Sequence, residues 1–482
     1  MIEIQPHCQT YISVRTNDRG IVRELAEHFT FKVPGYQFMP AYKRGMWSGD
    51  IQLYNQRTGL IYYGLLSKVE QFCKSNNYGY TIDSELQPNT DINLAEITKL
   101  INESITADIQ IRDYQITAVF NAIQTNRRLL VSPTGSGKSL VIYAIQHYYN
   151  AKTLIVVPST ALCSQLAGDF IEYNNQYSDT IHKVYEGSPK QTDKRITIAT
   201  WQSLYKQPKE FFDQFGCVIC DEAHLAKASS ITSIMEKLTK CKYKFGLTGT
   251  LDGTPTNKLV LEGLFGPVYE VTTTSKLIEQ KHLANFSIKC ITIDYDDTQK
   301  QLCKTMTYGD ELDMIISNTK RNKLITNLAC SVEGNTLVLF QFVEKHGKIL
   351  YDLIKNNTDR PVYFIHGKVS GDDRNDMRKI VEQQDNAIIV ASVQTFSTGI
   401  NIKSLKNIIF CSPSKSRIRT LQSIGRVLRR SETKTDSVLY DIADNLTWKS
   451  RKNYTLQHFI ERVKIYSKEN FPYKLYTVRL QK

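Results

Sequence analysis

The stretch LLVSPTGSGKSL, residues 129–140, constrains the fold of this chain more strongly than any other. Its apolar start is typical of a buried strand in a parallel sheet, and apolar residues return at helical spacing after Ser139. The glycine-rich residues between them can continue neither element. The stretch therefore predicts a strand, a tight loop and a helix, with backbone N–H groups converging at the positive end of the helix dipole.

A loop of this kind is suited to hold the phosphates of a nucleotide. We expect Lys138 to reach the β and γ phosphates and the Ser139 hydroxyl to bind Mg²⁺. The usual pattern GxxxxGK[ST] begins with glycine, whereas Ser132 holds that place here. The alternative is a chance loop between a strand and a helix. The residues predicted to bind ATP in this loop are Pro133, Thr134, Gly135, Ser136, Gly137, Lys138 and Ser139.

Apolar strands alternate with helical segments along two stretches of the chain, about 100–285 and about 290–447. The expected strands are LLV, TLIVVP, ITIAT, CVICDE and KFGLTGT in the first stretch, and TLVLFQF, VYFIHG, AIIVAS, NIIFCS and SVLYDIAD in the second. Alternation of this kind predicts an α/β fold with two doubly wound parallel sheets in tandem.

The first 95 residues predict a separate small α+β domain. QTYISVRT and GDIQLYN alternate as half-buried strands, and GIVRELAEHFTF and LLSKVEQFCKSN have the spacing of amphipathic helices. LQPNTDIN is a plausible linker. The predicted domains are 1–95, a nucleic-acid-binding domain; 96–285, the ATP-binding domain; 286–448, a second domain of the same kind; and 449–482, a basic extension with a helix at about 455–468.

Charge and cysteine content indicate the kind of partner and the cellular compartment to expect. The net charge is +13, and the last 82 residues hold 18 Lys and Arg against 6 Asp and Glu, a local net charge of +12. Such a region suggests a phosphate-backbone partner, although a merely solvated surface is the alternative. Ten scattered cysteines suit reduced thiols, and Cys217 and Cys220 read as buried strand residues rather than a metal site. With no membrane span or secretory signal visible, we expect a cytoplasmic protein, in a host cell if it is phage-encoded.

A second motif, VICDEAHLA, places two carboxylates where a buried strand ends. Asp221 is suited to hold Mg²⁺ through water, and Glu222 to polarise the attacking water as a general base. His224 can pass the state of the γ phosphate to a neighbouring element. About 85 residues after the phosphate-binding loop, DEAH indicates an ATPase.

With both motifs in place, residues 108–447 resemble a superfamily-two helicase with two RecA-like domains. RDYQITAV resembles the adenine-reading element, with Gln115 addressing the base, and LTGT resembles the element that couples the ATP site to the nucleic-acid track. ASVQTFSTGINIK, which includes Gly399, resembles a motif that faces both ligands. The resemblance implies nucleic-acid contacts by Pro158, Ser159, Thr160, Thr200, Trp201, Gln202, Phe340, Gln341, His366, Gly367 and Thr395.

The stretch LQSIGRVLRR supplies the guanidinium groups that such a motor needs. Its spacing places Gln422, Arg426 and Arg429 on one helical face at i, i+4 and i+7. Arginines presented from a second domain can stabilise charge developing on the γ phosphate only when the two domains close. The alternative is a basic amphipathic helix lying on solvent.

Over nearly its whole length the chain is similar to the UvsW helicases of T-even-type phages. YQFMPAYKRGMWSGDIQLYN, PKEFFDQFG and KFGLTGTLDG carry this resemblance. It implies activity on branched DNA: R-loops, stalled forks and Holliday-type junctions. In the front domain Tyr36, Phe38, Tyr42 and Trp47 interleave with Lys43 and Arg44, and aromatics beside cations can stack on bases and pair with phosphates. The alternative is a β-hairpin whose aromatics form its own core.

Three functions therefore compete. The first is an ATP- and Mg²⁺-dependent helicase or translocase on branched or double-stranded DNA and RNA–DNA hybrids, acting as a monomer. The second is an RNA helicase or the motor subunit of a restriction-type complex. The third, from another class, is a nucleic-acid-binding protein with an inactive ATPase, which the presence of Lys138, Asp221, Glu222, Arg426 and Arg429 disfavours.

Overall fold

The chain folds into two compact units in the computed structural model. The structure describes residues 1–88, 91–185, 192–224, 228–251, 255–367, 369, 371–399, 402, 404–412, 424–425, 428 and 436–480. The first unit comprises Met1–Ser132 and Gly137–Thr272, and the second comprises Thr273–Lys482 together with Pro133–Ser136. No described helix combines the length and apolar character that a membrane crossing requires.

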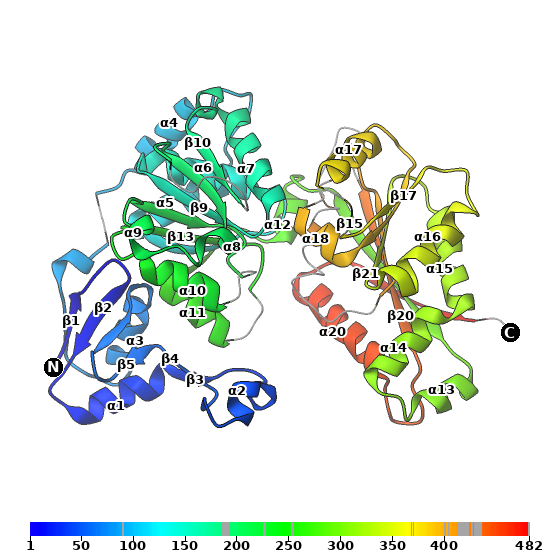
Figure 1. Cartoon of the computed structure of the whole chain (residues 1–482), viewed down its shortest axis with the longest axis horizontal. Helices are drawn as coiled ribbons and strands as arrows, with labels where there is room; N and C mark the ends of the chain where they lie inside the picture. Colours follow the sequence, from blue (N-terminus) through cyan, green and yellow to red (C-terminus); the bar gives the residue numbers. More distant parts are fainter. Residues whose placement is uncertain are drawn as a thin grey trace. The chain divides into compact units, whose positions relative to one another are not determined.

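The N-terminal part of the first unit is a small mixed sheet with helices beside it (Figure 1). Its strand order is β5 (Tyr54–Asn55), β6 (Leu60–Tyr62), β2 (Tyr11–Arg15), β1 (Ile2–Pro6) and β7 (Tyr80–Ile82); its helices are α1 (Arg19–His28) and α3 (Leu66–Ser75). Asp18 starts α1 because its carboxylate accepts hydrogen bonds from the amides of Gly20 and Ile21. A second, two-stranded sheet pairs β3 (Thr30–Lys32) with β4 (Asp50–Gln52), and α2 (Pro40–Lys43) lies between them in sequence.

The rest of the first unit is built on a seven-stranded sheet in which every pair of neighbours is parallel. Its order is β10 (Ile181–Val184), β11 (Ile196–Thr200), β9 (Thr153–Val157), β12 (Cys217–Cys220), β13 (Tyr243–Thr248), β8 (Arg127–Val131) and β14 (Val268–Glu270). The helices are α4 (Leu94–Ser104), α5 (Asp113–Thr125), α6 (Lys138–Tyr149), α7 (Thr160–Tyr173), α8 (Trp201–Leu204), α9 (Lys209–Phe212), α10 (Ala228–Lys237) and α11 (Pro255–Phe265).

Apolar residues on both faces of the strands explain why helices cover both faces of this sheet. On β9, Leu154 and Val156 belong to one buried cluster, whereas Ile155 and Val157 belong to another. Helices α4 to α7 lie on one side of the sheet, and α10 and α11 lie on the other (Figure 1). A strand with apolar residues on both faces must be covered on both faces, and a doubly wound sheet provides this cover with helices on each side.

The N-terminal sheet shares one continuous apolar core with the seven-stranded sheet. Ile4, Tyr62 and Leu65 of the former belong to the same buried cluster as Leu154 and Phe265 of the latter. A Cβ on Gly64 would lie 2.0 Å from the carbonyl oxygen of Glu262, so only glycine permits this approach. The N-terminal sheet is therefore packed on the seven-stranded part of the first unit rather than tethered to it.

Buried polar contacts fix the same joint. The hydroxyl groups of Tyr11 and Tyr62 both donate to Glu236 Oε1, at 3.0 and 2.7 Å. Lys244 Nζ, on β13, donates to Thr10 Oγ1 at 2.8 Å, and burial together with nearby Arg127 lowers the pKa of Lys244 to about 7. Buried polar groups lose their partners if the N-terminal sheet shifts on the seven-stranded sheet, and unpaired buried groups are costly. These hydrogen bonds therefore fix one relative position of the two sheets.

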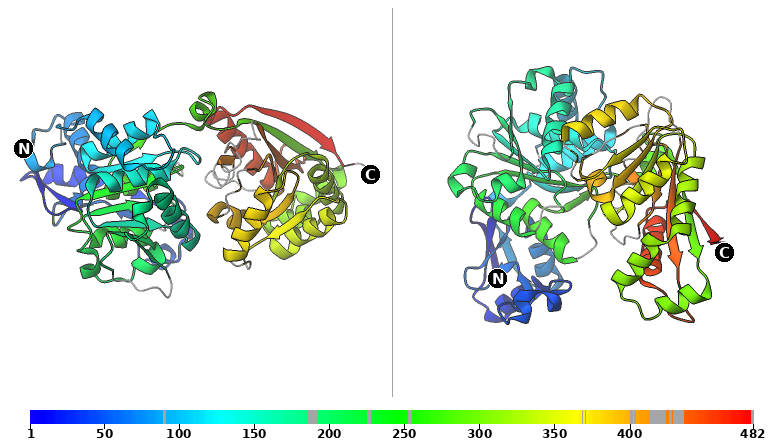
Figure 2. Two further views of the ribbon diagram at one scale, coloured as in Figure 1. Left: turned by 90° about the horizontal axis from the view of Figure 1, so that it is seen from above. Right: turned by 45° about the vertical axis from the view of Figure 1, so that its right-hand side comes forward.

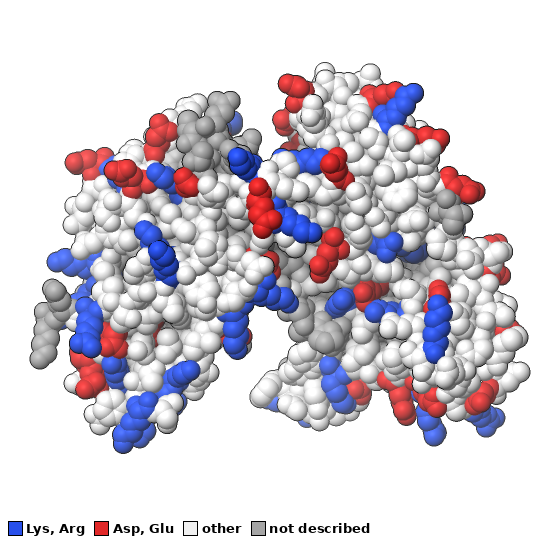
Figure 3. Space-filling view, turned by 180° about the vertical axis from the view of Figure 1, so that it is seen from behind, with Lys and Arg blue, Asp and Glu red and all other residues white. Residues whose placement is uncertain are grey.

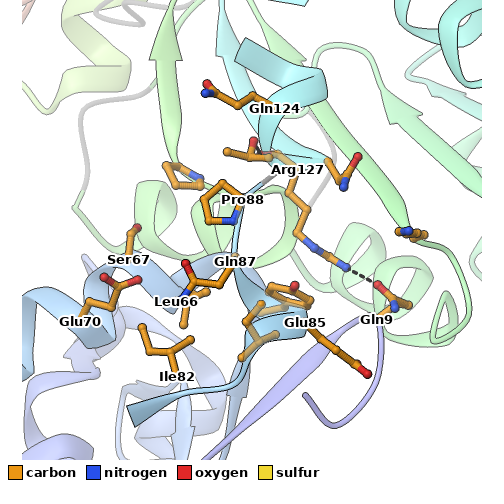
Figure 4. A pocket seen from close by; sticks show the side chains of 18 of the residues that line it. Gln9, Leu66, Ser67, Glu70, Ile82, Glu85, Gln87, Pro88, Gln124 and Arg127 are labelled. Atoms are coloured by element: carbon orange, nitrogen blue, oxygen red, sulfur yellow. Dashed lines mark hydrogen bonds between the residues drawn. The ribbon is translucent and has the colours of Figure 1, made fainter. Parts of the chain in front are cut away.

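A pocket of about 670 Å³ opens beside this joint (Figure 4). It is lined from the N-terminal side by Tyr63 and Glu70 and from the β8 side by Arg127. The guanidinium carbon of Arg127 lies 4.0 Å from the centre of the Tyr63 ring, and Nη2 donates to Gln9 Oε1 at 2.9 Å. Arg127 thus connects the two sides of the pocket.

The second unit repeats the seven-stranded parallel arrangement. Its order is β17 (Val362–Ile365), β18 (Ile388–Ser392), β16 (Thr336–Phe340), β19 (Asn407–Phe410), β20 (Asp436–Asn445), β15 (Asn285–Asp294) and β21 (Tyr473–Arg479). The named helices are α12 (Thr274–Glu279), α13 (Asp297–Cys303), α14 (Tyr308–Ser317), α15 (Thr319–Ser331), α16 (Lys348–Lys355), α17 (Gly371–Glu382), α18 (Val393–Gly399) and α20 (Tyr454–Lys468). The predicted fold class is confirmed.

Helix α20 and strand β21, near the C-terminus, are integrated into this second unit. Strand β21 pairs with β15 and extends the sheet at one edge, where the red strand lies beside the green one in Figure 2. Arg462 of α20 is buried and forms a two-point ion pair with Asp441 of β20, at 2.7 and 2.9 Å. Breaking such a buried pair costs about 3–5 kcal/mol. Arg462, one of the 18 basic residues counted in the last 82, therefore contributes to packing inside the protein.

Local sequence patterns located most strands but not all of them. GDIQLYN forms two short strands, β4 and β5, in different sheets, and the helix expected over GIVRELAEHFTF ends at His28, with Thr30 to Lys32 forming β3. Strands β1, β3, β6, β7, β10, β14, β15 and β21 were not predicted. Cys217 and Cys220 are buried strand residues as expected, and all ten cysteines are free thiols.

Candidate active site and nucleic-acid interface

Five motif-bearing loops leave the same edge of the first parallel sheet. The glycine-rich loop follows β8, LTGT follows β13, DEAH follows β12, the loop starting at Pro158 follows β9, and the loop at Trp201 follows β11. These strands are consecutive neighbours in the order β11-β9-β12-β13-β8. Because all are parallel, their carboxyl ends form one continuous row. The three nucleotide motifs are adjacent in that row, and the two expected nucleic-acid loops come next.

The glycine-rich loop needs glycine at two positions. Gly135 and Gly137 have φ of 88° and 77°, in the left-handed region that side chains disfavour. A Cβ on Gly137 would also lie 2.3 Å from Gln115 Nε2. The loop ends where α6 begins at Lys138, whose Nζ donates to the carbonyl oxygen of Ser132 at 3.3 Å. The predicted strand, loop and helix are all present.

Gln115 lies directly against this loop. It is buried on the first turn of α5, where Oε1 accepts from the amide of Arg112 at 2.9 Å. Its Nε2 donates to the carbonyl oxygen of Gly137 at 3.3 Å. The side chain therefore joins the start of α5 to the loop, and the recognition of a base by Gln115 remains a prediction.

The two DEAH carboxylates meet the lysine of the loop. Glu222 Oε1 lies 3.6 Å from Lys138 Nζ, and both side chains are about 15% exposed or less. Glu222 has φ of 49°, which is rare outside glycine, and its amide donates to Asp221 Oδ1 at 2.9 Å. Burial, the Glu222 charge and then that of Asp169 raise the pKa of the Asp221 carboxyl. The site is short of positive charge.

The residues present fit a magnesium ion. Ser139 and Asp221 offer a hydroxyl and a carboxylate, the hard oxygen ligands that Mg²⁺ prefers, and the excess of carboxylates over cations favours a divalent ion. Ser139 Oγ lies 2.8 Å from the Tyr173 hydroxyl, which orients it. The described residues contain no group of three or more His, Cys, Asp or Glu able to hold a metal alone.

His224 connects the carboxylates to the LTGT motif. Its Nδ1 hydrogen-bonds to Thr248 Oγ1 and lies 3.4 Å from Glu222 Oε2. Thr248 Oγ1 donates its only proton to the carbonyl oxygen of Thr250 at 2.8 Å, so it must accept from His224. His224 Nδ1 therefore carries a proton. The amide of Gly249 also lies 3.4 Å from Glu222 Oε2, so Glu222 and the LTGT loop are linked twice.

The expected nucleic-acid residues of the first unit differ in exposure. Thr160 and Gln202 are exposed, Pro158, Ser159 and Trp201 are half-buried, and Thr200 is buried. Ser159 caps α7 by accepting from the amide of Leu162 at 3.4 Å, and Thr200 Oγ1 lies 3.0 Å from Ser203 Oγ. These side chains shape the two loops, and the exposed atoms beside them are available for a backbone phosphate.

In the second unit the corresponding loops follow β16, β17 and β18, which are also consecutive neighbours. Gln341 and Gly367 are exposed and His366 is half-buried. Phe340 is fully buried and its ring packs 5.6 Å from that of Phe364, so a nucleic-acid contact here would have to come from the backbone. Thr395 is also buried, and its Oγ1 accepts from Ser392 Oγ at 2.7 Å.

Several predicted residues have no described surroundings. Gln422, Arg426 and Arg429 lie outside the described residues, and Gly399 is the last residue of α18. Lys43 and Arg44 are described and exposed at the end of α2. On the face drawn in Figure 3, Lys and Arg side chains are interspersed with Asp and Glu rather than gathered in one patch. The basic excess is thus not concentrated on that face.

Sequence analysis missed two contributors to this site. Tyr173 and Asp169 of α7 reach Ser139 and the surroundings of Asp221, but they follow the loop by more than 30 residues and belong to no motif. Thr248 lay within the recognised LTGT motif, although its bond to His224 was not foreseen. The neighbouring order of β12 and β13 creates that bond.

Three family models match successive parts of the chain. The model described as "DNA helicase UvsW, N-terminal" matches residues 2–83. "Type III restriction enzyme, res subunit" matches residues 108–253, and "Helicase conserved C-terminal domain" matches residues 319–431. The first covers the N-terminal sheet, and the other two cover the motif-bearing parts of the two units.

Comparison of this chain with individual proteins agrees with the family models. The ATP-dependent DNA helicase uvsW of Enterobacteria phage T4 is 36% identical over 99% of this chain and 100% of its own length. The DNA 3'-5' translocase XPB2 of Sulfurisphaera tokodaii is 25% identical over 73% of this chain and 85% of its own. The crystal structure of T4 UvsW matches over all of both chains with a TM-score of 0.53 and 33% identity.

Proposed function

The chain belongs to the UvsW family of ATP-dependent DNA helicases, and we propose that it is a translocase that remodels branched DNA, including R-loops, stalled forks and Holliday-type junctions. The row of loops on the first sheet supports this proposal. An ATP site on β8, β13 and β12 lies directly beside the β9 and β11 loops, where a strand of DNA would be held. The ATP site and the loops proposed to hold DNA are thus next to each other along one edge of the sheet.

In the proposed chemical step, each residue of the ATP site has one task. The loop amides and Lys138 hold the phosphates, and Ser139 and Asp221 would hold Mg²⁺, which supplies charge neutralisation for the phosphoryl group. Glu222, anchored by Lys138 and Gly249, orients the attacking water and takes its proton. Lys138 is already placed between the loop carbonyl of Ser132 and Glu222, so it needs little movement to bind phosphate.

The bond between His224 and Thr248 is proposed to pass the state of the γ phosphate to the DNA loops. Replacing Thr248 with Val removes the hydroxyl while keeping the shape. One lost hydrogen bond, worth about 1–1.5 kcal/mol, corresponds to roughly a tenfold loss of coupling. We expect base pairs unwound per ATP to fall by about that factor, measured by parallel unwinding and phosphate-release assays. Thr248→Ser retains the hydroxyl and should behave as wild type; equal coupling in all three proteins would contradict the proposal.

The predicted domain boundaries lead to a proposed role for each part of the chain. We propose that residues 1–95 bind nucleic acid, 96–285 bind ATP, 286–448 supply Gln422, Arg426 and Arg429, and 449–482 complete the second unit. The α20 and β21 elements support the last assignment, because they pack within the second sheet. The loops after β16, β17 and β18 would provide a second grip on the same strand.

The preference for branches is proposed to reside in the N-terminal sheet. Its shared core with the first parallel sheet, and the bonds from Tyr11 and Tyr62 to Glu236, keep it fixed to the part that binds ATP. A second DNA-binding surface at a fixed distance from a motor recognises two arms of a junction better than one continuous duplex.

Unwinding of matched substrates tests this function. A simple overhang, a fork, an R-loop and a four-way junction of equal duplex length are compared at one ATP and salt concentration. We expect the branched substrates to be unwound at least about tenfold faster than the overhang, the effect of a second contact of modest strength. Equal rates would contradict the branch preference.

The same assay separates the remaining alternatives. Unwinding of an RNA duplex in preference to DNA would indicate an RNA helicase or another motor class. ATP hydrolysis that no nucleic acid stimulates would indicate the inactive-ATPase alternative. We further propose that the protein acts as a monomer in the cytoplasm of its host cell, which sedimentation and fractionation test.

A further inference from the structure

The link between β3 and β4 is a folded projection of the N-terminal sheet, which we call the tip (residues 33–49). It contains the helix α2 and extends away from the five-stranded sheet in Figure 1. Lys32 and Asp50 close its base with an ion pair at 2.9 Å, and the amide of Val33 donates to the carbonyl oxygen of Gly49 at 2.9 Å. The tip is therefore a defined structure rather than an open loop.

Three of its aromatic residues make contacts within the tip or at its base. Tyr36 packs on Gly49, where a Cβ would lie 2.3 Å from the ring, and Gly49 has φ of 85°. Trp47 is half-buried and its Nε1 donates to the carbonyl oxygen of Asp50 at 2.8 Å. The Tyr42 ring meets that of Tyr36 edge-on at 4.8 Å. These contacts hold the tip in shape without help from a partner.

The other large apolar side chains of the tip remain in solvent. Phe38 and Met46 are 77% and 76% exposed, the highest values for large apolar side chains among the described residues. Met39 and Tyr42 are 39% and 38% exposed. Single exposed apolar residues are ordinary, but four within nine residues on a projecting structure mark a contact surface. Phe38 is therefore not a core residue, whereas Tyr36 and Trp47 are partly buried.

Charge identifies the partner that this surface fits. Lys43 and Arg44 are exposed beside the apolar residues, and residues 33–49 contain no acidic side chain. An apolar surface with flanking cations matches a nucleic acid, whose bases offer flat apolar faces bordered by phosphates. A surface that binds a protein more commonly has a rim of mixed polar residues around its apolar centre.

We propose that the tip is a wedge that enters DNA at a branch point. Phe38 and Met46 contact the exposed face of the base pair at the branch, and Lys43 and Arg44 bind the flanking phosphates. Apolar side chains inserted between base pairs must first unstack them. At a branch one face of the last pair is already unstacked, so insertion there costs less than within continuous duplex. This inference rests on the proposed branched-DNA function and assigns the branch selectivity to named residues.

The first experiment replaces both exposed apolar residues, as Phe38→Ser with Met46→Ser. Because neither side chain is buried, the fold is expected to survive, which circular dichroism checks. We expect four-way junction unwinding to fall by at least about tenfold relative to ATP turnover on single-stranded DNA, as for loss of base stacking. Leu302→Ser, which replaces a 59% exposed apolar residue of the second unit, is the matched control and should leave both rates unchanged.

A fluorescent base reports the contact directly. With 2-aminopurine at the branch point, wild-type protein is expected to change the emission, and the double variant is not. Lys43→Ala with Arg44→Ala should lower the slope of log affinity against log salt by about 2, since each phosphate contact contributes about one. Together these results would support insertion with phosphate anchoring.

The outcomes separate the wedge from the wider function. If wild type prefers branches and the double variant keeps that preference and the 2-aminopurine response, the wedge is overturned, and a protein-binding role of the tip replaces it. If wild type shows no preference for branches at all, the proposed function fails instead. An unchanged salt slope in the Lys43 and Arg44 variant would overturn the phosphate contacts alone.

Discussion

Replacing Glu222 with Gln is expected to lower the DNA-stimulated kcat for ATP hydrolysis by about 10²–10⁴-fold, the range of a lost general base. Gln has the same shape but cannot take a proton from water. The Glu222 side chain is only 15% exposed and is held by Lys138 at 3.6 Å, with the Gly249 amide 3.4 Å from its other oxygen. Gln can still accept from that amide, so the site should stay assembled.

Steady-state phosphate release and DNA binding by fluorescence anisotropy check this prediction together. DNA affinity should change by less than about twofold, because Glu222 lies among the nucleotide motifs and not in the β9 or β11 loops. Glu270→Gln, at an exposed position on β14, is the matched control and should leave turnover unchanged. A loss of DNA affinity as large as the loss of turnover would show that Glu222 is structural.

Replacing Arg426 with Ala should reduce kcat by about 10³–10⁵-fold, the effect of removing an arginine that stabilises charge on the transferred phosphoryl group. The QxxGRxxR spacing carries this prediction, since Arg426 itself is outside the described residues. Its neighbours Ile424 and Leu428 are buried, and the amide of Leu428 donates to the carbonyl oxygen of Ile424 at 3.1 Å.

Two further variants sharpen the Arg426 test. Arg426→Lys keeps the charge but not the planar fork, so only partial recovery of kcat is expected. Arg430→Ala removes a neighbouring cation that is outside the QxxGRxxR pattern and should cost little. Steady-state hydrolysis at saturating ATP and DNA measures kcat without interference from weaker binding. A near-normal rate for Arg426→Ala would contradict catalysis by closure of two domains.

The buried ion pairs of the second unit limit how the basic C-terminal region can be interpreted. Arg462 neutralises Asp441 and Arg321 neutralises Asp444, both fully inside the protein. Glu311 accepts from the amides of Tyr454 and Thr455 and so caps α20. Arg462 is thus used in packing, but Asp441 belongs to the same last 82 residues, so this pair leaves their local net charge of +12 unchanged.

The sequence by itself was sufficient for features that depend on nearby residues. The glycines of the ATP loop were visible because positive φ at Gly135 and Gly137 is a local requirement, and Lys138 and Ser139 are adjacent to them. The short strand β9 was visible because Leu154 to Val157 form an unbroken apolar run. DEAH was interpretable because Asp221 and Glu222 follow a strand directly.

Only the tertiary structure decided the features that depend on distant residues. The order of parallel strands brings Thr248 to His224 and Tyr173 to Ser139, and strand order is set by the burial of whole faces rather than by any local pattern. Likewise Tyr36 and Phe38 are both aromatic, yet one is packed on Gly49 and the other is exposed. Which of two similar side chains is covered depends on what folds against it, and that information is spread over the chain.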